Sequence, residues 1–167
     1  MKKIVSLVSA LLLILTIFSV SFVSADPGLE SGIVGETIFV PEKEQQVTSS
    51  DNVSVLANPM GRIDCVATST GGAICDWRIA AGFKKINYSN VQVIFEKWEN
   101  FAWKYVSTSN FNYPVNPPKS VIEDQAGIGM LNPGFYRARL GGTFLTVEDG
   151  RFVASAETPA TFTVPNP

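Results

Sequence analysis

Carboxylates and aromatic rings are the side chains through which this sequence could act, because the chain contains no histidine. The absence of histidine excludes Ser-His-Asp and Cys-His nucleophilic arrangements and most zinc sites. No Ser-x-x-Lys sequence is present to supply a serine–lysine pair. We therefore expect a protein that is not an enzyme and that carries no metal and no other cofactor.

Two pairs of acidic residues keep a hydrolase open as the alternative. Glycoside hydrolysis uses two carboxyl groups roughly 5–10 Å apart across a cleft. Asp64 and Asp76 flank the two cysteines, and hairpin pairing would place them one position off each other on one strand face. Glu96 and Glu99 lie in an aromatic segment. The competing interpretation is that these acids are solubilising charges on strand exteriors.

Three aromatic residues and one acid form the most informative cluster. If residue 98 pairs with 103 across a short turn, then 96 lies opposite 105, and Glu96, Trp98, Trp103 and Tyr105 share one face. Aromatic rings beside carboxylates can stack on sugars. We name these four residues as ligand-binding candidates, with a cell-surface glycan as the ligand. Two alternatives stay open: the rings belong to the core, Trp103 above all, or they contact an extracellular protein.

Cys65 and Cys75 are the two cysteines of the chain. They lie on either side of a turn at Ser69–Gly72, so a hairpin centred near Thr70 brings them face to face. In an exported chain such a pair predicts a disulfide bond. Buried free thiols are the alternative, and the spacing is too wide for a Cys-x-x-Cys redox motif.

Short β-prone runs separated by Gly, Pro and Asn predict an all-β fold, an antiparallel β-sandwich of seven to nine strands. We expect the core to come from Val91, Val93, Phe95, Val106, Phe135 or Tyr136, and Phe152. The proline-rich segment 110–120 is expected to be a crossover loop or a connection between two sheets. The candidate segments for these strands span 35–40, 52–57, 62–68, 73–80, 91–98, 103–108, 120–131 (with a bulge), 135–140, 143–148, 151–156 and 161–164.

The N-terminus has the pattern of a secretory signal peptide. Lys2 and Lys3 precede an apolar run that ends at Val23-Ser24-Ala25, with small residues at the cleavage positions. An uncleaved membrane anchor is the alternative. We expect a signal peptide (1–25), a flexible segment (26–51) and a β-sandwich domain (52–167). The 15 acidic residues outnumber the 13 basic ones and no basic cluster occurs, so nucleic acid is not an expected partner.

Two segments carry a family resemblance. VIFEKWENFAWKYV (93–106) and PGFYRARL (133–140) together resemble the hairpin and the Gly-aromatic-Tyr-Arg strand of small uncharacterised secreted proteins of Gram-positive bacteria. The second segment is also similar to the penultimate strand of immunoglobulin-like domains. The resemblance covers roughly residues 52–160 and implies an immunoglobulin-like fold and an exported location, but no activity. This chain departs from the pattern in Cys75 and in its longer 110–120 segment.

These observations lead to one expected function and two alternatives. We expect a secreted protein, extracellular or associated with the cell wall, that binds a cell-surface glycan or an extracellular protein. It would meet the membrane only through the signal peptide. The first alternative is a small carboxylate-dependent hydrolase. The second is a secreted toxin or inhibitor that acts through the 110–120 segment.

Overall fold

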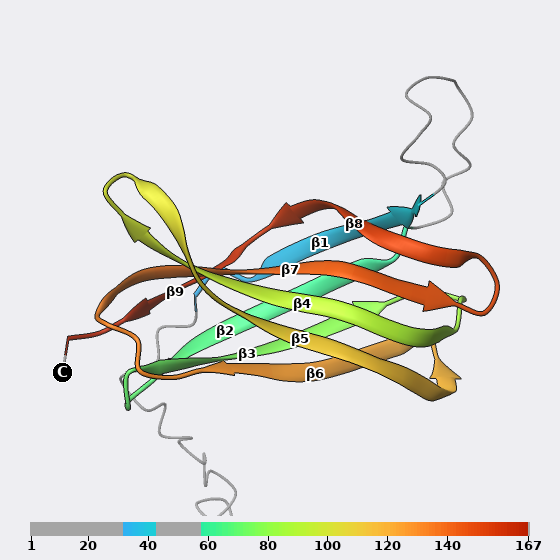
Figure 1. Ribbon diagram of the computed structural model, residues 1–167, viewed down its shortest axis with the longest axis horizontal. Coiled ribbons are helices and arrows are strands. Elements are labelled where there is room, and N and C mark those ends of the chain that lie inside the picture. The colour runs from blue at the N-terminus through green and yellow to red at the C-terminus, as the bar shows by residue number, and fades with distance from the viewer. Residues whose placement is uncertain (1–31, 43–57, 167) are drawn as a thin grey trace, which may run out of the picture.

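The computed structural model describes residues 32–42 and 58–166, which form an all-β fold (Figure 1). The predicted signal peptide and the strand expected at 52–57 lie outside these residues. Within them, no helix is long and apolar enough to cross a membrane. The strands are β1 (Gly35–Pro41), β2 (Met60–Thr68), β3 (Gly72–Ala80), β4 (Ile86–Glu99), β5 (Ala102–Lys119), β6 (Val121–Ile128), β7 (Gly134–Thr146), β8 (Gly150–Thr158) and β9 (Ala160–Val164).

All nine strands belong to one antiparallel sheet that curls into a nearly closed barrel (Figure 1). The strand order is β5-β4-β7-β8-β1-β2-β3-β6, and β9 pairs with β7. The expected immunoglobulin-like sandwich of two sheets is therefore wrong, although the all-β class and the number of strands are confirmed. The strand β1 lies between β8 and β2, so the sheet begins well before the boundary that we expected at residue 52.

The long strand β7 explains why the chain forms one sheet rather than two. We expected two strands separated by Gly141-Gly142, but β7 runs unbroken through both residues. It pairs with β4 along one edge, and with β9 and then β8 along the other. Gly142 has φ +94°, and a Cβ atom there would lie 2.4 Å from the Asn90 carbonyl oxygen. The glycine thus permits a close contact between β4 and β7 instead of ending the strand.

The inner face of the sheet encloses one aromatic core. Phe144 stacks on Phe152 and meets Phe39 edge to face, with ring centroids 5.2 and 5.1 Å apart. Tyr136 stacks on Phe162 and donates a hydrogen bond from its hydroxyl to the Asn132 carbonyl at 2.6 Å. The seven buried aromatic rings of this core occupy inward positions on six strands. They are Phe39, Trp77, Phe95, Tyr136, Phe144, Phe152 and Phe162.

The expected core was right at five positions and wrong at one. Val91, Val93, Phe95 and Phe152 are buried, and of the pair Phe135 or Tyr136 it is Tyr136 that is buried. Val106 is exposed because a bulge shifts the pairing of β5 against β4: Phe95 lies opposite Ser107 while Glu96 lies opposite Tyr105. The extra residue on one strand turns the side chain of Val106 out of the core.

The proline-rich segment is the second half of β5 rather than a crossover loop. The strand extends to Lys119 and pairs with β4 as far as Ile86. Proline is tolerated here because β5 ends the strand order and has a free edge on the side away from β4. The strand expected at 120–131 is β6, but its pairing with β3 is regular and contains no bulge.

Cys65 and Cys75 form a disulfide bond across the β2–β3 hairpin, with Cα atoms 4.1 Å apart. Both side chains point into the core and are no more than 1% exposed. The bond therefore fixes the register of the hairpin from inside the barrel, next to Trp77.

We expect the double substitution Cys65→Ala, Cys75→Ala to lower the free energy of unfolding by about 2–4 kcal/mol, because the open chain gains conformational freedom. Equilibrium urea unfolding measures this loss. Dithiothreitol should destabilise the wild type to the level of the variant and leave the variant unchanged. A double variant whose unfolding midpoint without reductant equals that of the wild type would contradict a stabilising bond.

Candidate binding surface on the β4–β5 hairpin

The β4–β5 hairpin ends in a two-residue turn that displays an aromatic side chain. Asn100 and Phe101 have φ values of 53° and 62°, as a type I′ turn requires. Asparagine is common in such turns, but a bulky residue with positive φ is an outlier. Phe101 is 94% exposed. In Figure 1 this hairpin projects from one end of the barrel.

Four further rings lie next to this turn. Trp98 pairs with Trp103, and the ring centroids are 5.2 Å apart at an interplanar angle of 63°. Phe135 at the start of β7 lies 5.6 Å from Trp103. Trp98, Tyr105 and Phe135 are 42%, 67% and 44% exposed, whereas Trp103 is partly buried. We call Trp98, Phe101, Trp103, Tyr105 and Phe135 the aromatic surface.

A cation fixes the position of Trp103. The guanidinium carbon of Arg137 lies 4.5 Å from the centroid of the Trp103 ring. Such a cation–π contact adds to the two aromatic contacts of the same ring. Trp103 is therefore held between Trp98, Phe135 and Arg137, and it does not belong to the barrel core as we had considered. The fully packed tryptophan of the core is Trp77, which meets Phe111 edge to face at 4.8 Å.

Glu96 holds the arginines rather than facing solvent. Its Oε2 accepts hydrogen bonds from Nε of Arg137 at 2.6 Å and from Nε of Arg139 at 3.0 Å. Arg139 also pairs with Glu157. Burial disfavours the charged form of Glu96, but the hydrogen bonds from the two arginines outweigh it and lower the pKa of this carboxyl group. The structure thus brings the four candidates together, with Glu96 as a support beneath Trp103 rather than as a free hydrogen-bonding group.

The other carboxylates lie elsewhere. Glu99 pairs with Lys97 at 3.0 Å near the end of the hairpin. Asp64 and Asp76 lie directly opposite each other on the outer face of β2 and β3, not one position off as we expected, because the hairpin is symmetric about Thr70. They point to the same side of one sheet and do not face each other across a cleft. In residues 32–42 and 58–166, no group of three or more carboxylate or cysteine side chains could hold a metal ion.

The sequence pattern predicted the β4–β5 hairpin but did not indicate three of the residues that form or support this surface. Phe101 was treated only as part of a turn, although an aromatic residue in a two-residue turn is unusual enough to be a signal. Phe135 and Arg137 alternate outward along β7, and their proximity to Trp103 depends on the pairing of β7 with β4. That pairing is not visible in the local pattern.

Glu96→Gln should lower the free energy of unfolding at pH 7 by about 1–3 kcal/mol, because two arginines lose a charged partner. The pKa of Glu96 in the folded protein lies below its ordinary value of 4.5. The contribution of ionised Glu96 to the free energy of unfolding is therefore complete above that pH and is lost as the pH falls through the folded-state pKa. The difference in the free energy of unfolding between wild type and variant should become smaller below about pH 4.5.

Urea unfolding at pH 7 and at pH 3 measures both effects. The matched control is Glu36→Gln, since Glu36 is exposed and forms no ion pair within the described part of the chain. A gap for Glu96→Gln that stays constant between the two pH values would refute the ion-pair account.

Comparison with known proteins gives no family for this chain. No protein-family model, no curated protein and no solved structure matches it. The proposals below therefore depend on the contacts, exposure and charges described above.

Proposed function

We propose that this chain is a secreted, non-catalytic binding protein and that the aromatic surface of the β4–β5 hairpin contacts its ligand. The N-terminal pattern of a signal peptide supports export. The buried disulfide is compatible with an extracellular location. The resemblance to small secreted proteins of Gram-positive bacteria points in the same direction.

The conformation of Phe101 is the observation that carries this proposal. A non-glycine residue in the left-handed region costs roughly 1–2 kcal/mol. Glycine at this position would remove that cost and complete the Asn-Gly pair that type I′ turns prefer. Instead, the chain holds a phenylalanine there and exposes almost all of it to solvent. Strained residues that persist in this way cluster at ligand-contacting sites.

The geometry of the two tryptophans favours a glycan as the ligand. Their rings meet edge to face at 63°, so the pair presents ring faces in two directions rather than one flat platform. A sugar ring could stack its apolar face on one of these exposed ring faces. Since Arg137 fixes Trp103 before any ligand arrives, binding would cost little side-chain entropy.

The other functions expected from the sequence have weaker support. A hydrolase would need two carboxyl groups on either side of a scissile bond, and Asp64 and Asp76 lie side by side on one sheet face. An inhibitor was expected to act through a protruding 110–120 loop, but residues 110–114 and Lys119 pair with β4. A protein partner for the aromatic surface stays as the competing proposal, and the binding experiment separates it from a glycan.

Binding to insoluble polysaccharides and to purified cell wall tests the proposal. We expect protein comprising residues 26–167 to sediment with at least one of these polymers. The exposed pair Trp98→Ala, Tyr105→Ala should reduce the bound fraction at least tenfold, since loss of stacking costs about 1–3 kcal/mol. The matched control is Phe83→Ala, because Phe83 is fully exposed at the opposite end of β4.

Two results would speak against a glycan-binding hairpin. One is that no polymer retains the wild type. The other is that the Phe83→Ala control loses as much binding as the Trp98→Ala, Tyr105→Ala variant does. In either case the exposed rings would be assigned to a protein partner instead.

Phe101→Gly should separate stability from binding. Removing the left-handed phenylalanine should raise the free energy of unfolding by on the order of 1 kcal/mol. The same change should weaken polymer binding, because the turn loses its aromatic side chain. Urea unfolding and sedimentation of the same preparation measure both quantities. A variant that is less stable than the wild type would show that Phe101 serves the fold rather than the ligand.

A further inference from the structure

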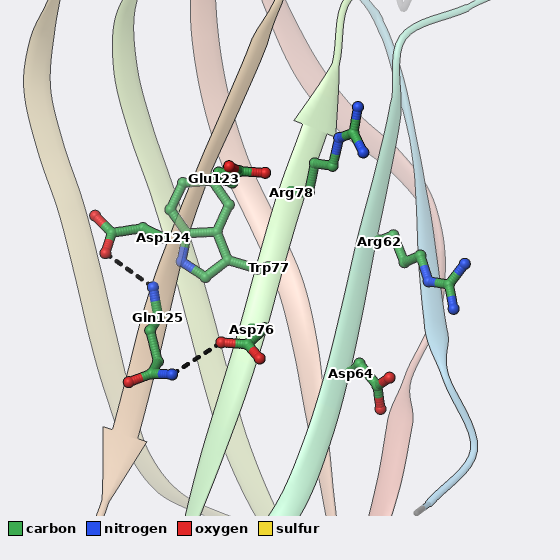
Figure 2. A pocket seen from close by; sticks show the side chains of 8 residues that line it. All are labelled: Arg62, Asp64, Asp76, Trp77, Arg78, Glu123, Asp124 and Gln125. Atoms are coloured by element: carbon green, nitrogen blue, oxygen red, sulfur yellow. Dashed lines mark hydrogen bonds between the residues drawn. The ribbon is translucent and has the colours of Figure 1, made fainter. Parts of the chain in front are cut away.

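A second surface lies on the outer face of β2 and β3, away from the aromatic hairpin. Two arginines and two aspartates form a square there: Arg62 lies opposite Arg78, and Asp64 lies opposite Asp76. We call these four residues the charge square. They line a hollow of about 630 Å³ together with Glu123, Asp124 and Gln125 of the neighbouring strand β6 (Figure 2).

The β2–β3 pairing in the charge square is unfavourable, although Glu123 on β6 lies opposite Arg78. Like charges directly opposite each other on antiparallel strands destabilise a sheet. Diagonal ion pairs between Arg62 and Asp76, or between Arg78 and Asp64, would relieve this cost. No member of the square forms an ion pair with another residue of the described part. Figure 2 shows both guanidinium groups turned away from the two aspartate carboxylates.

One polar atom of the hollow lacks a partner as well. Oδ1 of Asp64 is buried and accepts no hydrogen bond from any described residue. Asp76 is held by the Gln125 side chain, whose Nε2 donates to Oδ1 at 2.9 Å. A buried carboxylate oxygen without a donor costs free energy, which a bound ammonium or N–H group would recover.

The spacing of the paired residues along the strands selects the ligand. On each strand the Cα atoms of the arginine and the aspartate are two residues apart, about 7 Å. An arginine pair binds one carboxylate well, and an aspartate pair binds one ammonium. We propose that the charge square binds a zwitterion whose carboxylate and ammonium groups are separated by about 7 Å. This chemistry belongs to free ω-amino acids and to the C-terminal lysine of a peptide.

Calorimetry with 6-aminohexanoate tests this proposal on the wild-type protein. We expect saturable binding, and at least tenfold weaker binding of hexanoate and of hexylamine, each of which carries only one of the two charges. Equal binding of hexanoate would overturn the proposal, since it would leave only an anion site. Absence of binding at tens of millimolar would overturn it as well.

Variants check that the binding takes place at the square. Two double variants should each weaken binding of 6-aminohexanoate at least tenfold. One carries Arg62→Gln and Arg78→Gln, and the other carries Asp64→Asn and Asp76→Asn. The control Arg151→Gln, which changes an exposed arginine on β8, should bind as the wild type does. Near-UV circular dichroism confirms that each variant is folded. Wild-type affinity in both folded double variants would place the ligand elsewhere and overturn the proposal.

Two further measurements complete the test. If the square recognises chain ends, a peptide ending in lysine should displace 6-aminohexanoate, and the same peptide with a C-terminal amide should not. Displacement by neither peptide assigns the site to free ω-amino acids. Sedimentation velocity examines the competing occupant. Salt-sensitive self-association that the arginine double variant abolishes would make the square an interface between two copies and overturn the zwitterion site.

Discussion

The pairing of β7 with β4 is the constraint on which the rest of the molecule depends. It directs Phe95, Ala138 and Tyr136 into the core and places Glu96 opposite Arg137 on the outside. A slip by one residue would exchange these faces, because side chains alternate along a strand. The same register therefore determines the packing of the barrel and the support beneath Trp103. The close contact at Gly142 helps to hold it.

Local pattern was sufficient to predict the hairpins. The symmetric run around Thr70 gave the β2–β3 pairing and the disulfide, and the alternation at 91–98 gave the pairing of Trp98 with Trp103. Both predictions concern strands that are adjacent in sequence, where turn residues and period-two alternation fix the register. The bulge at Val106 was invisible, because one inserted residue leaves the alternation intact on either side of it.

Long-range pairing could not be predicted in the same way. A sandwich and a barrel use the same short strands, and they differ in whether hydrogen bonds continue from β8 through β1 to β2. The interpretation of Trp103 as core had the same origin, since it assumed a second sheet above the hairpin. Half of the charge square was predicted from the sequence, because Asp64 and Asp76 were named as a carboxylate pair and the arginines beside them were not.

The burial of the disulfide also determines when the bond can form during folding. Both sulfur atoms lie inside the barrel beside Trp77, where neither an oxidant nor a thiol reagent can approach them in the closed state. The bond must form while the β2–β3 hairpin is still accessible, before β6 and the β4–β5 pair enclose it. Once the barrel has closed, exchange of the bond requires the wall to open. The oxidation state that the two cysteines reach during folding is therefore retained in the folded protein.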